Sequence, residues 1–195
     1  MYLSLIKPTF DWILALIVLL LLIPVFMLLS VIIKIDTRGP VFFIQSRLGK
    51  DGKEFKIFKF RSMSVTHSKP VNNIQYEDDP RITRVGRIIR KTSLDELPQL
   101  INIVKGEMSF IGPRPPVTHF PKKYSEYSDF EKERFSVKPG ISGLAQVRAR
   151  EEHDWDKNIP VDVEYARTVS FKLDLKLFLK SITFFFRTDN IYRRK

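Results

Sequence analysis

The sequence predicts an α+β protein, mainly helical, that is held to a membrane by its N-terminal segment. An apolar run extends from Trp12 to Ile33 without a charged residue, and Ser30 is its polar exception. Downstream, a small β element is followed by several segments with helical periodicity. A chain of 195 residues suits one domain plus an anchor. We expect a membrane anchor over residues 1–36 and a globular domain over residues 37–195.

The anchor is long enough to cross the hydrocarbon core as a helix. A cleaved signal peptide is disfavoured because the run exceeds an h-region and lacks a small-residue cleavage site. Pro24 interrupts the run and predicts a kink, since proline removes a backbone donor and clashes with the preceding turn. Basic residues flank both sides, Lys7 before and Lys34 and Arg38 after. A kinked spanning helix and a helix that turns back both remain open.

The elements expected after the anchor follow from periodicity. Residues 41–44 and 54–61 read as strands, with polar loops over residues 45–52 and 64–79. Helices are predicted over residues 81–91 and 97–105, in part of residues 117–134, and once or twice within residues 161–186. The stretch from Phe171 to Lys195 interleaves apolar and basic residues, which suits a helix lying in the lipid headgroup region.

Composition narrows the function classes. Lys and Arg outnumber Asp and Glu by 33 to 22, for a net charge of +11, so the surface attracts nucleic acid, anionic lipid or phosphorylated substrates. The absence of cysteine excludes a disulfide framework, a thiolate nucleophile and a cysteine zinc site. His67, His119 and His153 lack metalloprotease spacing, and no GxSxG element is present.

The segment from Ser93 to Pro98 contains two adjacent carboxylates, Asp95 and Glu96. Ser93 and Glu96 have the spacing of a capping box, which would make the segment an ordinary helix start. Pro98 favours a helix that begins later. In either case the carboxylates lie by a helix N-terminus, where they can hold Mg²⁺ or attack phosphorus.

Two further segments are suited to binding phosphate. In Gly112-Pro113-Arg114-Pro115, two prolines fix the backbone around an arginine, the residue suited to bidentate phosphate contact. Residues 138–147, KPGISGLAQV, contain two glycines that permit close backbone approach, and Arg148 and Arg150 follow. The acidic run at residues 77–79 could bind a metal, but such loops are more often simply solvated.

These motifs together resemble the bacterial sugar transferases, the monotopic polyprenyl-phosphate phosphoglycosyl transferases of the small catalytic-domain type. The resemblance rests on the segments KFRSM at 59–63, DPRITRVGRIIRKTSLDELPQLINIVKGEMSFIGPRP at 79–115, KPGISGLAQV at 138–147 and SFKLDLK at 170–176. It implies transfer of a sugar 1-phosphate from a UDP-sugar to polyprenyl (undecaprenyl) phosphate with release of UMP. It further implies a covalent aspartyl-phosphosugar intermediate and a role in starting surface glycans or glycoconjugates, such as O-antigen, capsule or exopolysaccharide.

The resemblance also implies roles for individual residues. Asp95 would be the nucleophile, Glu96 its partner, and Mg²⁺ would bind the diphosphate near Asp95. Phosphate or substrate contacts are expected from Arg114, Arg150, Lys59, Arg61, Arg90 and Gln146.

Two positions depart from the family pattern. After Ala-Gln-Val the family usually reads Asn-Gly-Arg-Asn, whereas this chain has residues 148–151 as RARE, which keeps the arginine at Arg150. The family often has serine before the anchor proline, where this chain has Ile23.

Because the candidate site follows the anchor and must meet a cytoplasmic UDP-sugar, we expect residues after 34 to be cytoplasmic. We therefore predict that the anchor enters the cytoplasmic leaflet of the bacterial inner membrane, bends at Pro24 and returns, with membrane lipids as partners. A membrane-tethered nucleic-acid binder and an inactive scaffold member of the family are the competing hypotheses. The dyad disfavours both, so no nucleic-acid partner is expected. The sugar, the pathway and the oligomeric state, with a homo-oligomer among the alternatives, stay open.

Overall fold

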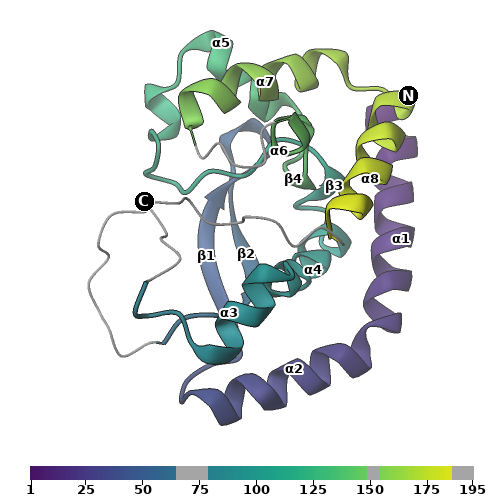
Figure 1. Cartoon of the computed structure of the whole chain (residues 1–195). Helices are drawn as coiled ribbons and strands as arrows, with labels where there is room; N and C mark the ends of the chain where they lie inside the picture. The colour runs from purple at the N-terminus through teal and green to yellow at the C-terminus, as the bar shows by residue number, and fades with distance from the viewer. Residues whose placement is uncertain (65–78, 149–153, 186–195) are drawn as a thin grey trace.

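The computed structural model describes residues 1–64, 79–148 and 154–185, and these form a mainly helical chain with two small sheets (Figure 1). The helices are α1 (Lys7–Leu21), α2 (Ile23–Asp36), α3 (Arg84–Lys91), α4 (Gln99–Val104), α5 (Asp129–Lys132), α6 (Leu144–Arg148), α7 (Trp155–Thr168) and α8 (Phe171–Phe185). The strands are β1 (Phe42–Leu48), β2 (Glu54–Phe60), β3 (Ser109–Ile111) and β4 (Gly140–Ser142). A π-helical turn, Tyr2–Ile6, precedes α1, and 3₁₀ turns cover Lys50–Gly52, Leu94–Glu96, Tyr124–Glu126 and Glu133–Ser136.

Strands β1 and β2 form an antiparallel hairpin in which Phe42 lies opposite Phe60 and Leu48 opposite Glu54. The strand predicted over 54–61 is confirmed, but the loop predicted over 45–52 is wrong for its first four residues. These continue β1, because their polar side chains find partners across the hairpin, as where Lys56 Nζ donates to Ser46 Oγ at 2.6 Å. The parallel pair β3–β4 has only three residues a strand, too few for a periodic signal.

Most predicted helices are confirmed with altered ends. Helix α3 begins at Arg84 because the side chain of Thr83 accepts a hydrogen bond from Gly86 N at 2.8 Å and caps it. Residues 117–134 contain only short helical turns, and the C-terminal region contains α7 and α8. The part of the amphipathic stretch after residue 185 lies outside the described residues.

The N-terminal apolar segment consists of two helices that run in different directions (Figure 1). They meet at Leu22, whose φ of −89° and ψ of 1° depart from helical geometry, and Pro24 lies in the first turn of α2. By length and composition, the helical stretch Tyr2–Leu21 would suffice to cross a membrane, which is weak evidence by itself.

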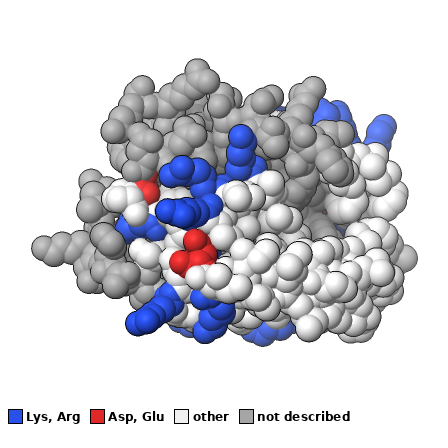
Figure 2. Space-filling view, turned by 60° about the horizontal axis from the view of Figure 1, so that its bottom comes forward, with Lys and Arg blue, Asp and Glu red and all other residues white. Residues whose placement is uncertain are grey.

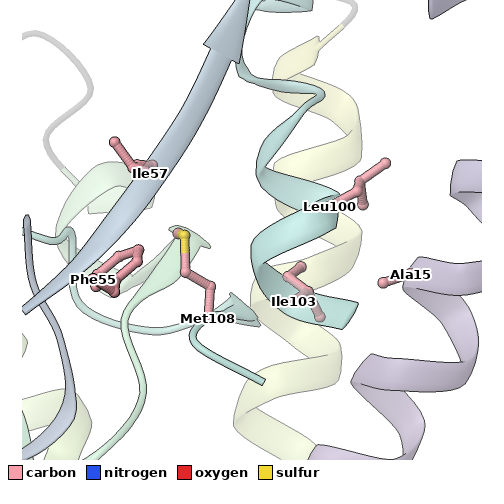
Figure 3. Packing of buried hydrophobic residues seen from close by; sticks show 6 residues of the cluster. All are labelled: Ala15, Phe55, Ile57, Leu100, Ile103 and Met108. Atoms are coloured by element: carbon pink, nitrogen blue, oxygen red, sulfur yellow. The ribbon is translucent and has the colours of Figure 1, made fainter. Parts of the chain in front are cut away.

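Both anchor helices contribute to buried cores. Ala15 of α1 packs in one cluster with Phe55 and Ile57 of β2 and with Leu100 and Ile103 of α4 (Figure 3). Leu29 and Ile33 of α2 pack in another, together with Phe60 of the hairpin and Ile89 of α3. Each of the two N-terminal helices therefore contributes buried side chains to the hydrophobic interior.

A buried polar network ties the start of the chain to α8. Lys7 Nζ lies 2.7 Å from an Asp174 carboxylate oxygen and 3.8 Å from an Asp11 oxygen. The same Asp174 accepts hydrogen bonds from the hydroxyls of Tyr2 at 2.6 Å and Tyr165 at 2.7 Å. Buried charges of this kind hold their elements in register, since separating them would leave a charge unpaired.

Outside these cores, several helices expose apolar side chains. The exposed apolar residues of α1, α2 and α8 are Phe10, Trp12, Ile13, Ile17, Leu20, Leu21, Ile23, Met27, Leu28, Val31, Ile35, Phe171, Leu175, Leu179 and Ile182. Figure 2 shows a broad uncharged surface beside a cluster of Lys and Arg side chains that surrounds a small acidic patch. An exposed apolar surface of this extent is typical of a protein that contacts a membrane or a partner.

Candidate active site

The two carboxylates Asp95 and Glu96 lie in the 3₁₀ turn between α3 and α4. Ser93 enters this turn in the left-handed conformation, with φ of 56°, and its side chain makes no capping bond. The capping box suggested by its spacing from Glu96 is therefore not formed. Helix α4 begins instead at Gln99, with Pro98 before it, as the alternative interpretation of the sequence expected.

The turn is fixed by the leucines on either side of the dyad. Leu94 and Leu97 pack against the cluster that contains Leu29 and Ile33 of α2. Asp95 and Glu96, between them, are half-buried. The packing thus seats the turn on a cluster shared by α2, β2 and α3.

Glu96 is held by cations. Its Oε1 atom lies 2.5 Å from the ammonium of Lys59, which extends from β2. Burial alone would raise the pKa of Glu96, but Lys59, Arg114 and Arg47 outweigh it and lower the pKa to about 2. Glu96 is therefore a permanent anion at physiological pH, and it fixes Lys59 at the site.

Asp95 has a different electrostatic environment. Burial raises its pKa to about 6, against the opposing charge of Lys59 and with a further contribution from neighbouring Glu96. Arg90, from the end of α3, also acts on it and favours ionisation. Asp95 is thus a carboxylate that is ionised at neutral pH yet more basic than an ordinary aspartate, which suits a nucleophile.

The arginine loop adjoins this dyad. Arg114 is exposed at the tip of the loop and lowers the pKa of Glu96 through its charge. Arg47 of β1 belongs to the same cluster, because burial, Arg114 and Glu96 together set its own pKa at about 10. Arg47 was not among the predicted site residues, because residues 45–52 were predicted as a polar loop. Residues 45–48, QSRL, have no apolar alternation that would extend the strand, so no local signal indicated Arg47.

Three glycines bring the third motif against the arginine loop. A Cβ atom on Gly140 would lie 2.1 Å from the backbone nitrogen of Gly112, and one on Gly143 would lie 2.2 Å from the Gly112 carbonyl oxygen. The expected close backbone approach is confirmed, and it allows the β3–β4 pairing.

The predicted contact residue Gln146 and the nearby Arg148 have structural partners. Gln146 Nε2 donates to the Ile141 carbonyl at 3.0 Å and so braces β4 from α6. Arg148, which precedes the predicted contact residue, forms a two-pronged ion pair with Glu164 of α7. Arg150 lies outside the described residues.

Arg61 lies away from the dyad at the end of α2. Its guanidinium is buried and donates to the carbonyl oxygens of Arg38 at 2.6 Å, Thr37 at 2.7 Å and Ile33 at 3.2 Å. A guanidinium is well suited to the free carbonyls at a helix C-terminus. This placement favours a structural role over the phosphate contact that the sequence suggested for Arg61.

A magnesium ion would have few protein ligands here. Among the described residues, no group of three or more His, Asp or Glu is placed to hold a metal. Mg²⁺ is commonly bound by one or two carboxylates together with substrate phosphates. Asp95 fits that mode, because Lys59 is bonded to Glu96 and not to it.

Comparison with known proteins gives a consistent result. The family model described as bacterial sugar transferase matches residues 2–188. A UDP-glucose:undecaprenyl-phosphate glucose-1-phosphate transferase of Escherichia coli (strain K12) is 42% identical over 178 residues, which are 89% of this chain and 38% of that protein. A UDP-N-acetylgalactosamine-undecaprenyl-phosphate N-acetylgalactosaminephosphotransferase of Aeromonas hydrophila is 39% identical over 180 residues, 91% of this chain and 43% of that protein.

A shorter relative is covered more completely. A UDP-glucose:undecaprenyl-phosphate glucose-1-phosphate transferase of Caulobacter vibrioides is 37% identical over 191 residues, 95% of this chain and 72% of that protein. The chain thus spans less than half of the Escherichia coli and Aeromonas proteins, but most of the Caulobacter protein.

Proposed function

Because the chain belongs to the bacterial sugar transferase family, we propose that it transfers a sugar 1-phosphate from a UDP-sugar to polyprenyl (undecaprenyl) phosphate. UMP is the second product, and the lipid-linked sugar starts assembly of a surface glycan or glycoconjugate. The names of the relatives support this reaction class, since they describe transfer from UDP-sugars to undecaprenyl phosphate. The observation that carries the proposal is the dyad in the turn Leu94–Glu96: Lys59 Nζ donates to Glu96 Oε1 at 2.5 Å, which leaves the adjacent Asp95 carboxylate available to attack phosphorus.

In the first step, a carboxylate oxygen of Asp95 attacks the phosphorus that bears the sugar. An acyl-phosphate bond forms, the bond to the bridging diphosphate oxygen breaks, and UMP leaves with the electron pair. In the second step, a phosphate oxygen of the polyprenyl phosphate attacks the same phosphorus and releases the Asp95 carboxylate. Splitting the transfer in this way replaces one difficult displacement with two easier ones.

The charges around the dyad support phosphoryl chemistry. Cationic side chains outnumber the two carboxylates in the electrostatic neighbourhood of the dyad. These cations are Lys59, Arg90 and Arg114, whereas Arg47 acts on Glu96 but is bonded to Gln45 and to the carbonyl of Pro115. Fixed positive charges can stabilise the negative charge that develops on the transferring phosphoryl group and on leaving UMP. Glu96 would keep Lys59 in place through its 2.5 Å contact, and so acts on the reaction through that ammonium.

Magnesium is proposed as the metal cofactor, with Asp95 as its protein ligand. When bound, Mg²⁺ would neutralise part of the diphosphate charge. The other ligands would come from substrate and water, since the described residues around the dyad add no further cluster of carboxylates.

The same geometry supports a membrane placement for the N-terminal helices. We place α1 and α2 in the cytoplasmic leaflet of the inner membrane, with the chain bending near Pro24 and returning to the cytoplasmic face. The exposed apolar side chains of α1, α2 and α8 would contact lipid, with α8 lying at the interface. Leu94 and Leu97 pack against the cluster to which α2 contributes Leu29 and Ile33, and this packing would then hold the dyad near the bilayer surface, where polyprenyl phosphate presents its phosphate.

Topology is tested by labelling a cysteine placed at Ser4, in a chain that has no cysteine of its own. A membrane-impermeant maleimide should label it in inverted membrane vesicles and not in intact spheroplasts. Labelling from the periplasmic side of spheroplasts would show that the anchor spans the membrane.

The reaction is tested by screening UDP-sugars for UMP release in membranes supplied with polyprenyl phosphate and Mg²⁺. A UDP-sugar with radioactive phosphorus next to the sugar should label the protein when polyprenyl phosphate is withheld, and neutral hydroxylamine should remove the label. Asp95→Asn should abolish both signals, whereas Asp129→Asn, a change at a fully exposed aspartate of α5, should leave them unchanged. Full turnover by Asp95→Asn would exclude Asp95 as the nucleophile.

A further inference from the structure

The loop Pro113–Pro116, which contains Arg114, has few backbone N–H donors. Three of its four residues are prolines, which have a fixed φ and no N–H group. Arg114 is exposed, so its side chain does not anchor the loop by burial. The rings of the three prolines are buried, and the hydrogen bonds that hold the loop are accepted by its carbonyl oxygens.

Each of the four carbonyls accepts a hydrogen bond, and the donors come from three parts of the chain: β1, the start of β4 and the 3₁₀ turn Glu133–Ser136. Leu48 N donates to Pro116 O at 3.0 Å, and Gly140 N donates to Pro113 O at 3.0 Å, so the two ends are held by main-chain groups. The two central carbonyls are held by guanidinium groups, because no main-chain donor reaches them. Arg134 Nη2 donates to Arg114 O at 2.8 Å, and Arg47 Nη1 donates to Pro115 O at 3.0 Å.

The two arginines differ in their surroundings. Arg134 is fully buried, pairs with the buried carboxylate of Asp162 and lies against the rings of Phe135 and Trp155, so it belongs to the core. Arg47 is half-buried on β1. Its other terminal nitrogen, Nη2, donates to Gln45 Oε1 at 2.7 Å, which orients the guanidinium toward the loop.

We propose that Arg47 is a positioning residue, which holds Arg114 in the place where it contacts the diphosphate. The role rests on the proposed function, because it assumes that Arg114 binds phosphate. A planar guanidinium can bridge Gln45 and the Pro115 carbonyl with two differently directed N–H groups, which an ammonium cannot reproduce. Small displacements of a group that binds the transferring phosphoryl are costly, with about 1 Å costing about a hundredfold in rate.

The test is a double-mutant cycle on purified full-length protein, with UMP release as the assay. Arg47→Met should lower kcat/KM for the UDP-sugar about 10- to 100-fold, and Arg47→Lys should recover part of it. Arg114→Gln should have an effect at least as large. If Arg47 acts through Arg114, the double variant should be no worse than Arg114→Gln alone. Multiplicative effects, or activity of Arg47→Met within about twofold of the unmodified chain, would overturn the proposal.

Hydrogen exchange separates this inference from the proposed function, because it needs no turnover. The amides of Gly140 and Leu48 donate hydrogen bonds to the two ends of the loop, and their exchange should accelerate in Arg47→Met but not in Arg167→Gln. The latter control removes an exposed arginine that is paired with Glu133. Unchanged exchange in a folded Arg47→Met protein would show that Arg47 does not hold the loop, even if the transferase reaction is confirmed. Faster exchange in a chain without transferase activity would support the role of Arg47 in holding the loop and reject the proposed function.

Discussion

Replacing the proposed nucleophile should make the protein more stable. Burial raises the pKa of Asp95 from its ordinary 3.8 to about 6, so the ionised form is disfavoured by the fold. At about 1.4 kcal/mol per pKa unit, keeping Asp95 ionised above pH 6 costs about 3 kcal/mol. The cost is absent at a pH where the Asp95 carboxyl is protonated in both the folded and the unfolded chain. It grows as pH rises from about 4 to about 6. Asp95→Asn removes it.

The neighbouring residue provides a control of opposite sign. Although burial opposes it, the charges of Lys59, Arg114 and Arg47 lower the pKa of Glu96 from 4.5 to about 2. Glu96 therefore contributes stability that is fully present above about pH 4.5 and is lost as pH falls through about 2. Glu96→Gln should destabilise the fold at neutral pH by about 3 kcal/mol.

Thermal unfolding in detergent micelles, followed by tryptophan fluorescence at about pH 7.5 and about pH 4, measures both effects. Each kcal/mol moves the Tm of a chain of this size by about 2–4 °C. The Asp95→Asn protein should therefore unfold about 6–12 °C higher at neutral pH, and its advantage should largely disappear at the lower pH. Glu96→Gln should lower the Tm at neutral pH. Equal destabilisation by both variants, or a gain for Asp95→Asn that does not depend on pH, would refute this electrostatic account.

Further expectations concern the ends of α2, the glycine contacts and the pH profile. Arg61→Met should cost about 2–4 kcal/mol of unfolding free energy, because it leaves buried carbonyls without donors. Its control, Arg87→Met, changes an exposed position of α3 and should change the denaturation midpoint little. Gly140→Ala should abolish the yield of folded protein, because its Cβ would lie 2.1 Å from a backbone nitrogen. Gly106→Asn should cost only about 1 kcal/mol in the same expression and melting assays, because φ is 77° there and a Cβ would meet only Lys138 Nζ, at 3.7 Å. The rate of UMP release at limiting UDP-sugar should rise as pH increases through about 6, because Asp95 must be ionised to attack; a rate that is flat across this range would contradict the raised pKa.

Local patterns predicted those parts of the fold where one signal dominates. The alternation of residues 54–61 gave β2, and the apolar stripe of residues 81–91 gave most of α3. The site was predictable to a similar extent: Pro98 correctly indicated a helix start after the dyad, and the glycines of residues 138–147 correctly indicated close approach.

Other features depend on contacts that no local pattern contains. Arg61 follows a strand and precedes a loop, and its guanidinium is chemically suited both to phosphate and to helix carbonyls. Only the tertiary packing decides between them, and it places Arg61 at the end of α2. Arg47 was hidden because a polar strand segment resembles a loop until its partner strand is known.

The packing of α2 has a practical consequence for working with this protein. Phe60, Ile89, Leu94 and Leu97 share one buried cluster with Leu29 and Ile33 of α2. A version shortened to residues 37–195 would therefore not be a soluble catalytic fragment. It would expose the apolar side chains of this cluster to water and lose part of the packing that holds the Asp95 turn. Protein for crystallisation and inhibitor screening should keep the N-terminal helices, in detergent or nanodiscs. The helix α2, which exposes apolar side chains, also contributes to the cluster against which the Asp95 turn packs.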